Sequence, residues 1–236
     1  MRLLAGTSGF SYKAWKGSFY PETIREAGML KYYASQFDTV ELNNTFYRLP
    51  NEQTLRQWAE QVPAGFMFAL KASRVITHSR RLKEVTEPVE YLCRVTEALG
   101  AARGPILFGL PPNLKIDLDR LGALLALIPA GVRAAIEFRH ESWHDDAVFD
   151  LMRGHNIALC IAQTEEEETP FVATADWGYV RLRKVEYSGD ELVEWRTRIA
   201  AQTWTDAFVY FKHEDAGVGP KLAREFFHIP VSPTLQ

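Results

Sequence analysis

Eight short apolar runs recur along the chain, and this number constrains the fold more than any other feature. They predict strands at about residues 2 to 8, 38 to 43, 66 to 72, 105 to 110, 133 to 139, 157 to 163, 178 to 183 and 207 to 213. Helical patterning between them predicts helices at roughly 22 to 35, 52 to 60, 86 to 100, 117 to 127, 145 to 153, 189 to 201 and 219 to 227. Such alternation favours a parallel sheet, and eight strands favour a closed (β/α)₈ barrel of the TIM type. A doubly wound open sheet is the alternative, although no G-x-G-x-x-G motif follows the first strand.

One connection departs from this alternation. Residues 164–176, TEEEETPFVATAD, carry an acidic run and a proline but no helical periodicity, so we expect an irregular segment between strands six and seven. The chain shows no internal repeat and no linker between domains. We therefore expect residues 1–236 to form a single α/β domain.

Composition sets broad limits on class and location. The 236 residues are 47% hydrophobic and 24% charged with a net charge of −3, which is typical of a globular protein with one sizeable core and gives no global attraction to nucleic acid or anionic membranes. Cys93 and Cys160 stand far apart among apolar neighbours, which suits a reducing compartment. No apolar run approaches the roughly 18 residues that span a bilayer, and the N-terminal apolar stretch is too short for a signal peptide. We expect a cytoplasmic protein with no membrane partner.

Charged or amide residues end most of the apolar runs, as in VELN, FALK, IEFR, VRLR and VYFKH. Side chains alternate between the two faces of a strand, so Glu41 and Asn43 oppose Val40 and Leu42. Catalytic groups of a TIM barrel come from the C-terminal ends of its strands. The residues expected to face inward there are Ser8, Glu41, Asn43, Lys71, Glu137, Arg139, Arg181, Arg183, Lys212 and the adjacent His213.

Several of these stretches together resemble the YecE-like family, also called domain-of-unknown-function family 72. The similar segments are GTSGFSYKAWKGSFYP, VELNNTFYRLP, FALKASRVITH, LFGLPP, EFRHESW and YFKHEDAGVGPKLA, and they span nearly the entire chain. The resemblance implies a TIM-like barrel, in agreement with the strand count. It implies little about activity.

Glu41 and Glu137 are the sharpest candidates for a general acid and a general base. The alternative is that each pairs with a neighbouring cation, Lys71 or Arg139, in a structural network. Lys71 becomes a base or a Schiff-base nucleophile if burial lowers its pKa, whereas an ion pair with Glu41 would make it structural. His78 is a further candidate for proton transfer.

A second group of residues is predicted to bind the substrate. Arg139 and Arg181 suit an anion clamp, and the rings of Tyr12 and Trp143 suit stacking on a sugar or a base. The full set of predicted substrate-binding residues is Tyr12, Asn43, Arg139, Trp143, Arg181, Lys212 and His213. Gly217 and Gly219 precede the first turn of the last predicted helix, which suggests a phosphate site there, or merely a tight loop.

No cofactor or metal site is predicted. Histidines 78, 140, 144 and 213 follow predicted strands, which keeps a divalent metal ion as an alternative, but no metal-binding spacing is present.

The main hypothesis is an enzyme that applies acid–base chemistry to a small polar or anionic substrate, such as a sugar or phosphate derivative. One alternative is a barrel that binds or processes nucleic acid through the basic loop 74–83. Another is a non-catalytic barrel that binds a ligand or a protein partner. Neither reaction type nor oligomeric state follows from the sequence.

Overall fold

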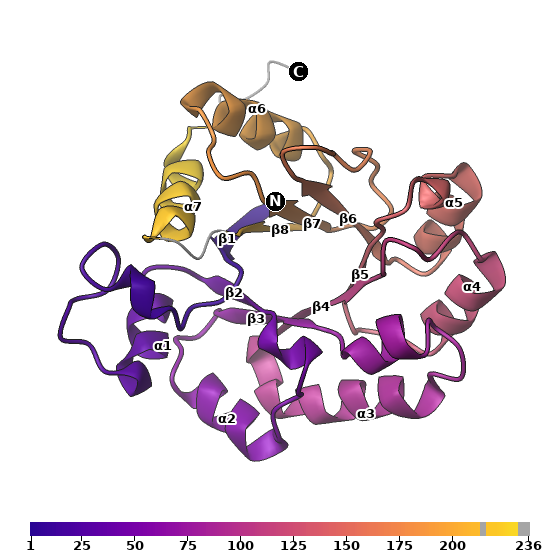
Figure 1. Cartoon of the computed structure of the whole chain (residues 1–236), viewed down its shortest axis with the longest axis horizontal. Helices are drawn as coiled ribbons and strands as arrows, with labels where there is room; N and C mark the ends of the chain where they lie inside the picture. Colours follow the sequence, from indigo (N-terminus) through magenta and orange to yellow (C-terminus); the bar gives the residue numbers. More distant parts are fainter. Residues whose placement is uncertain (213–215, 231–236) are drawn as a thin grey trace.

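Eight parallel strands form a nearly closed barrel in the computed structural model, which describes residues 1–212 and 216–230 (Figure 1). The strands are β1 (Arg2–Thr7), β2 (Thr39–Leu42), β3 (Met67–Lys71), β4 (Arg103–Gly109), β5 (Ala134–Glu137), β6 (Ala158–Gln163), β7 (Gly178–Leu182) and β8 (Asp206–Phe211). Their order in the sheet is β1-β8-β7-β6-β5-β4-β3-β2. The predicted strands and the barrel are therefore confirmed.

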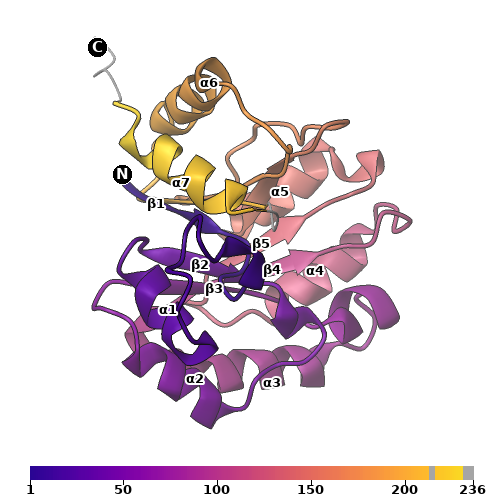
Figure 2. The ribbon, with the colours of Figure 1, turned by 60° about the vertical axis from the view of Figure 1, so that its left-hand side comes forward.

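The helices form an outer ring around the strands (Figures 1 and 2). They are α1 (Glu26–Ala34), α2 (Glu52–Glu60), α3 (Thr86–Thr96), α4 (Leu118–Ala126), α5 (Asp146–Gly154), α6 (Gly189–Ala200) and α7 (Val218–His228). Short 3₁₀ helices add η1 (Lys13–Trp15), η2 (Asn44–Phe46), η4 (Glu97–Ala102) and η5 (Glu141–Trp143), and η3 (Val75–Ser79) is a π-helical turn. None of the helices in the described part of the chain is long and apolar enough to cross a bilayer.

The first and second strands close the barrel through a short contact at their ends. Ser8 and Glu41 form a parallel bridge, and the Gly9 amide donates a hydrogen bond to the Glu41 carbonyl at 2.7 Å. A Cβ on Gly6 would lie 2.2 Å from the Thr39 carbonyl oxygen, so only glycine allows the two backbones to approach this closely. The seam thus places Glu41 directly beside the end of β1.

Alternation along the strands separates two apolar layers. Outward-facing side chains such as Val40, Ile136 and Val180 pack against the helices. The barrel interior is filled by a cluster that includes Leu4, Ala69, Leu107, Ala135, Ala158, Cys160, Trp177, Tyr179, Phe208 and Tyr210. Polar side chains begin where this interior cluster ends, at the C-terminal ends of the strands.

The connection between β6 and β7 contains no helix, as predicted. Side-chain and backbone contacts hold this connection instead: Thr174 Oγ1 accepts a hydrogen bond from the Leu159 amide at 2.7 Å, and the backbones of Gln163 and Glu168 form an antiparallel bridge. Because no helix covers it, the acidic segment 165–168 lies at the rim of the barrel beside the ends of β5 and β7.

Candidate functional site

The charged strand ends meet at the C-terminal mouth of the barrel. Lys71, Glu137 and Arg181 each stand two positions after a residue of the interior cluster, namely Ala69, Ala135 and Tyr179. Because side chains on a strand repeat every second residue, the same face that fills the interior ends in charge. The prediction that these ends face inward is confirmed for these three.

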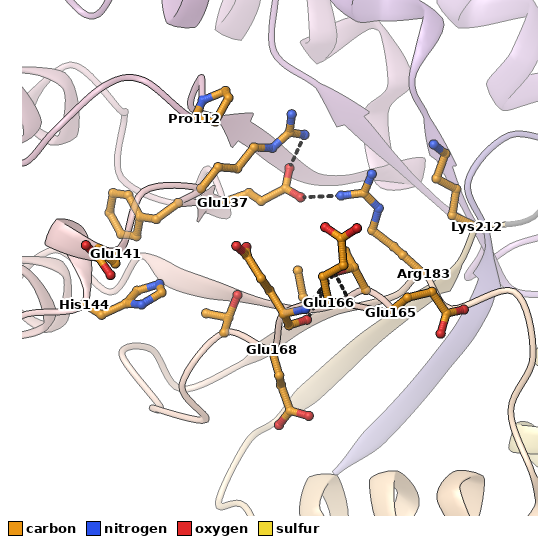
Figure 3. A pocket seen from close by; sticks show the side chains of 15 residues that line it. Pro112, Glu137, Glu141, His144, Glu165, Glu166, Glu168, Arg183 and Lys212 are labelled. Atoms are coloured by element: carbon orange, nitrogen blue, oxygen red, sulfur yellow. Dashed lines mark hydrogen bonds and ion pairs between the residues drawn. The ribbon is translucent and has the colours of Figure 1, made fainter.

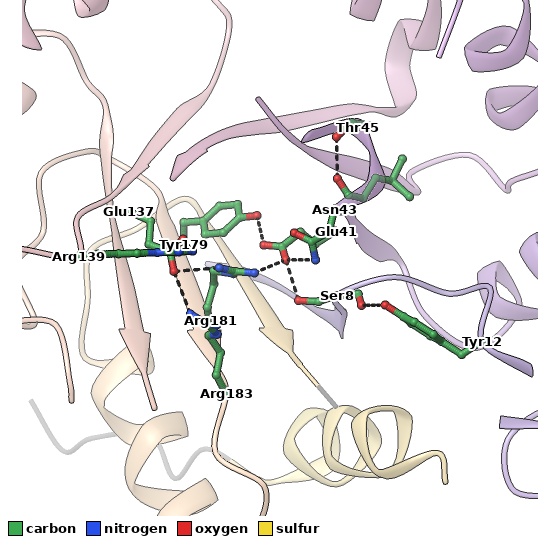
Figure 4. A network of polar contacts seen from close by, with 11 residues as sticks. Ser8, Tyr12, Glu41, Asn43, Thr45, Glu137, Arg139, Tyr179, Arg181 and Arg183 are labelled. Atoms are coloured by element: carbon green, nitrogen blue, oxygen red, sulfur yellow. Dashed lines mark hydrogen bonds and ion pairs between the residues drawn. The ribbon is translucent and has the colours of Figure 1, made fainter. Parts of the chain in front are cut away.

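A single guanidinium group joins the two carboxylates across the barrel (Figure 4). Arg181 Nη2 lies 2.9 Å from Glu41 Oε1, and Arg181 Nη1 lies 2.9 Å from Glu137 Oε1. Ser8 Oγ donates to Glu41 Oε1, and the Tyr179 hydroxyl donates to Oε2, both at 2.7 Å. We call these five residues the buried ion network, since each is at most 3% exposed.

The network keeps both carboxylates ionised. Burial by itself raises the pKa of Glu41, but the charge of Arg181 and the hydrogen bonds from Ser8 and Tyr179 outweigh it and hold that pKa below the ordinary value. The pKa of Glu137 is lowered in the same way, because Arg181, Arg139 and Arg183 together overcome the effect of burial. Groups of this kind are weak bases and are not protonated near neutral pH. The geometry therefore favours the structural network over the predicted general acid and base.

Two further guanidinium groups contact Glu137 from the solvent side. Arg139 Nη2 lies 3.0 Å from Glu137 Oε2, and Arg183 Nη1 lies 3.3 Å from Oε1. Their side chains are 30% and 23% exposed, in contrast to 3% for Arg181. Three arginines thus share one carboxylate, and two of them reach solvent. Together with Lys71 and Lys212 we call Arg139 and Arg183 the mouth cations.

Lys71 follows a different pattern from the arginines. Its Nζ forms no hydrogen bond or ion pair with residues 1–212 or 216–230, and it lies 4.7 Å above the ring of Phe46. Burial lowers its pKa to about 8, and Arg181 and Arg139 act in the same direction against the opposing charges of Glu137 and Glu41. The predicted ion pair between Lys71 and Glu41 is therefore wrong, because Arg181 takes the carboxylate.

A pocket of about 930 Å³ opens beside the network (Figure 3). Its basic side holds Arg139, Arg183 and Lys212 next to Glu137, and its other lining includes Glu141, His144 and the acidic segment 165–168. Within that segment Glu168 is engaged with Arg198 and Gln163, and Glu165 accepts from the Val185 amide. The pocket is thus strongly polarised, with cations at its floor and carboxylates at its rim. Lys71 does not line it and lies beyond Glu137, on the β3 side.

His78 lies on the Lys71 side of the mouth. Its ring packs edge-on against Phe46 with the centroids 4.9 Å apart, and its Nδ1 shares a 2.8 Å hydrogen bond with Thr77 Oγ1. Burial and the nearby charges of Arg139 and Lys71 lower its pKa, so the ring is mainly neutral at pH 7. Proton transfer through His78 stays a prediction.

Asn43 and Tyr12 surround the Glu41 end of the network. Asn43 Nδ2 donates to Glu41 Oε1 at 3.1 Å, and the Tyr12 hydroxyl donates to the Ser8 carbonyl at 2.8 Å (Figure 4). Both side chains are partly exposed. Their predicted contact with substrate stays untested, but their observed contacts support the network.

Two of the predicted substrate-binding residues are inaccessible. Trp143 is fully buried, stacks on Phe138 and donates from Nε1 to the Leu114 carbonyl. Arg181 has its two terminal nitrogens occupied by Glu41 and Glu137. Trp143 is therefore a core residue, and an anion clamp would use Arg139 with Arg183 rather than with Arg181.

The predicted phosphate-binding glycines and the possible metal ligands do not form a site at the mouth among the described residues. Gly217 is the left-handed N-cap of α7, where a Cβ would meet Ser18 Oγ at 2.5 Å, and Gly219 is buried in the first turn. Neither glycine lines the pocket, so packing of a tight loop explains them. His213 lies outside the described residues. Among the described residues, no three His, Cys, Asp or Glu side chains gather as metal ligands would.

Sequence reasoning missed two contributors to the mouth, Tyr179 and Phe46, and one polar contact inside the barrel, made by Tyr210. Tyr179 lies two residues before Arg181 and shares its inward face, so strand alternation was a sufficient signal for it. Tyr210 has the same relation to Lys212, and its hydroxyl shares a 2.7 Å hydrogen bond with Thr39 Oγ1. Phe46 sits in the η2 turn after β2, and no periodicity marks it as the ring beneath Lys71.

Comparison with known proteins gives a family match over most of the chain. The family model described as "Protein of unknown function DUF72" matches residues 4–230. UPF0759 protein YecE of Escherichia coli strain K12 is 31% identical over 113 residues, which are 47% of this chain and 41% of YecE. UPF0759 protein YunF of Bacillus subtilis strain 168 is 25% identical over 145 residues, 56% of this chain and 50% of YunF. The matched region thus spans half or less of these curated relatives.

Solved structures share the architecture. A DUF72 family protein of Thermotoga maritima MSB8 superposes with a TM-score of 0.86 at 26% identity and covers 96% of this chain and 98% of its own. D-psicose 3-epimerase, solved in the presence of D-fructose, superposes with a TM-score of 0.56 at 11% identity, covering 95% of this chain and 90% of its own. The second likeness concerns the fold alone.

Proposed function

The chain belongs to the DUF72 family and has a TIM-barrel fold, and from that premise and the geometry of the mouth we propose that it is an enzyme acting on a small anionic substrate by acid–base chemistry. The anion would bind at the basic floor of the 930 Å³ pocket. Arg139 and Arg183 would hold it, with Lys212 at the side. Lys71, rather than either carboxylate, would move the proton.

The main support for this proposal is that three arginines contact the carboxylate of Glu137. Arg139, Arg181 and Arg183 all contact Glu137, and Arg139 and Arg183 are partly exposed and line the pocket. Lys71 and Lys212 add further positive charge at the same end of the barrel. Guanidinium groups bind carboxylates and phosphates through paired hydrogen bonds, so partly exposed guanidinium groups that line a pocket favour an anionic ligand.

The opposite wall limits the size of that ligand. Glu141 and the acidic segment 165–168 repel negative charge at the rim, while the floor attracts it. A compact anion reaches the floor without contacting the rim, whereas the repeated phosphates of a nucleic acid would meet both. The polarised pocket therefore favours a small substrate over the nucleic-acid alternative.

Lys71 suits proton transfer because its pKa of about 8 lies near neutral pH. About a tenth of the molecules then carry a neutral amine at pH 7, far more than for a lysine of ordinary pKa. Glu41 and Glu137 contribute by fixing Arg181, and they offer no mobile proton in this range. This assignment keeps the catalytic role that the sequence suggested for Lys71 and replaces the general acid and base roles suggested for Glu41 and Glu137 with a structural one.

A ligand screen by thermal unfolding tests the proposal. The panel contains inorganic phosphate, sugar phosphates, small carboxylic acids and short oligonucleotides, and the proteins are the wild type, Arg139→Gln and the control Arg56→Gln. Arg56 is an exposed arginine of α2 that pairs with Glu52. A small anion should raise the midpoint of the wild type and the control by mass action, and Arg139→Gln should weaken that affinity by about tenfold or more.

Two results would contradict the proposal. The first is the absence of any shift with small anions in the wild type. The second is an equal shift in Arg139→Gln, which would place the anion elsewhere. A shift with oligonucleotides alone that falls steeply with salt would instead support the nucleic-acid barrel. Saturable binding of an anion that the protein never converts would favour a non-catalytic binding barrel.

A further inference from the structure

Lys71 is the cation at the mouth whose charged group is least engaged. Arg139, Arg181 and Arg183 all contact Glu137, whereas Lys71 Nζ has no hydrogen bond or ion pair with the described residues. Its observed contact is the face of the Phe46 ring at 4.7 Å. A lysine needed only for structure would ordinarily be paired when it is mostly buried.

The groups around Lys71 lower the pKa of its amine. Burial is the largest effect on this pKa, and the charges of Arg181 and Arg139 add to it. Glu137 and Glu41 oppose the shift, but their carboxylates are already engaged by Arg181. A low-dielectric position and cationic neighbours, which are the two conditions that activate lysine nucleophiles, therefore raise the neutral fraction of this amine above that of an ordinary lysine.

Gly109 lies where Lys71, Glu137 and Arg139 approach one another. Gly109 is opposite Glu137 in the register of β4 and β5. A Cβ at this position would lie 3.0 Å from Glu137 Oε2, 3.4 Å from Lys71 Cε and 3.9 Å from Arg139 Nη2. The Lys71 side chain and the Arg139 guanidinium group therefore both lie within 4 Å of this one position, with the Glu137 carboxylate beside them.

We propose that Lys71 forms a Schiff base with a small aldehyde or ketone that carries a carboxylate or phosphate group. This inference rests on the proposed function, because Arg139 and Arg183 must hold the anionic group while Lys71 reaches the carbonyl carbon. It narrows the substrate class from small anions to anionic carbonyl compounds.

The step consumes one proton from solvent and no other reactant. The lone pair of neutral Nζ forms a bond to the carbonyl carbon, the carbonyl π electrons move to oxygen, and a proton passes from nitrogen to that oxygen to give a neutral carbinolamine. Its hydroxyl takes up a proton from solvent and leaves as water, while the nitrogen lone pair closes the C=N bond. The amine, the carbonyl compound and one proton therefore give one iminium ion and one water molecule.

Trapping with sodium borohydride tests the inference, because hydride converts an iminium ion into a stable secondary amine. Wild type is incubated with glyoxylate, pyruvate or glyceraldehyde 3-phosphate at pH 7.5, reduced, digested and analysed by mass spectrometry. The peptide that contains Lys71 should carry the adduct at a level about tenfold or more above exposed Lys31 and Lys115. Lys71→Met should abolish this adduct and leave labelling of the exposed lysines unchanged.

Parallel thermal-shift measurements with lactate and inorganic phosphate separate the two proposals, since neither compound can form a Schiff base. Binding of these anions without preferential labelling of Lys71 would overturn the Schiff base and leave the anion site standing. If neither anion binding nor preferential labelling of Lys71 is observed, both the anion site and the Schiff base are overturned. Strong labelling of Lys71 that is equal in Arg139→Gln would contradict the anionic substrate class, because the clamp would then play no part.

Discussion

Two neighbouring regions of the mouth use the same residue types in opposite ways. In the buried ion network, Arg181 joins Glu41 and Glu137, and Ser8 and Tyr179 donate hydrogen bonds to the two oxygen atoms of Glu41. On the solvent side, Arg139 and Arg183 contact Glu137 while remaining 30% and 23% exposed. The buried charges hold the strand ends in place, and the partly exposed cations line the pocket in which we propose that a ligand binds.

The buried ion network should contribute mainly to stability, and the mouth cations mainly to ligand binding. Removing one member of a buried ion pair leaves its partner charged and desolvated, which costs about 3 to 5 kcal/mol. A partly exposed arginine can turn toward water when its partner or ligand is lost, so its removal costs far less. Variants of the two regions should therefore change different measured quantities.

The largest expected effect is the loss of stability in Arg181→Met. This change leaves two buried carboxylates without their shared cation, so we expect the free energy of unfolding to fall by about 3 to 5 kcal/mol or more. Denaturant unfolding measures this loss. The matched control, Arg139→Gln, should lose only about 1 kcal/mol of unfolding free energy. Adding Glu41→Gln to Arg181→Met should recover at least about 1 kcal/mol, since one orphaned charge is removed. Equal destabilisation by Arg181→Met and Arg139→Gln would show that the two regions do not differ.

At Arg183 we expect the opposite: a large loss of ligand affinity with little loss of stability. Arg183→Gln should weaken binding of whichever small anion the screen identifies by about 10- to 100-fold, because a charge-assisted hydrogen bond contributes about 1.5 to 3 kcal/mol. Its unfolding free energy should change by about 1 kcal/mol or less. Isothermal titration calorimetry and denaturant unfolding measure the two quantities. A variant that loses stability and retains affinity would place Arg183 with the buried ion network.

A smaller effect concerns the pH dependence of stability at Lys71. Folding lowers its pKa to about 8 from the ordinary 10.5, so between these values the unfolded chain binds more protons than the folded one. The cost of burying the charge is present in full below pH 8 and is relieved as the pH rises. Relative to Lys71→Met, the wild type should gain about 1 to 1.5 kcal/mol of unfolding free energy between pH 8 and 9.5. Denaturant unfolding at both pH values measures this gain, and parallel behaviour of the two proteins would contradict it.

The sequence predicted the architecture because the fold follows local patterns. Each strand appears as a short apolar run, and alternation along VELN and IEFR correctly divides inward from outward residues. The absence of a helix in residues 164–176 was equally visible, because an acidic run with a proline lacks helical periodicity. These features depend on residues that are close in sequence.

The partners at the mouth could not be predicted in the same way. Arg181 meets carboxylates that are 140 and 44 positions away in the chain, and only the curvature of the barrel brings all three together. The expected adjacency of strands two and three instead suggested Lys71 for Glu41. Trp143 was misjudged for a related reason, since its position after a strand does not reveal that the η5 turn directs it onto Phe138.

The titration of the Lys71 amine is the measurement to make first, because both proton transfer and the Schiff base need an amine that is mostly desolvated and forms no ion pair, as observed among the described residues. Lysine labelled with ¹³C at Cε reports the titration of each amine by NMR, and the Lys71 signal is assigned by its absence in Lys71→Met. We predict a midpoint at about pH 8 for this signal. A midpoint at or above the ordinary lysine value of about 10.4 would show that the amine is paired or fully hydrated, and would contradict both its role in proton transfer and the Schiff base.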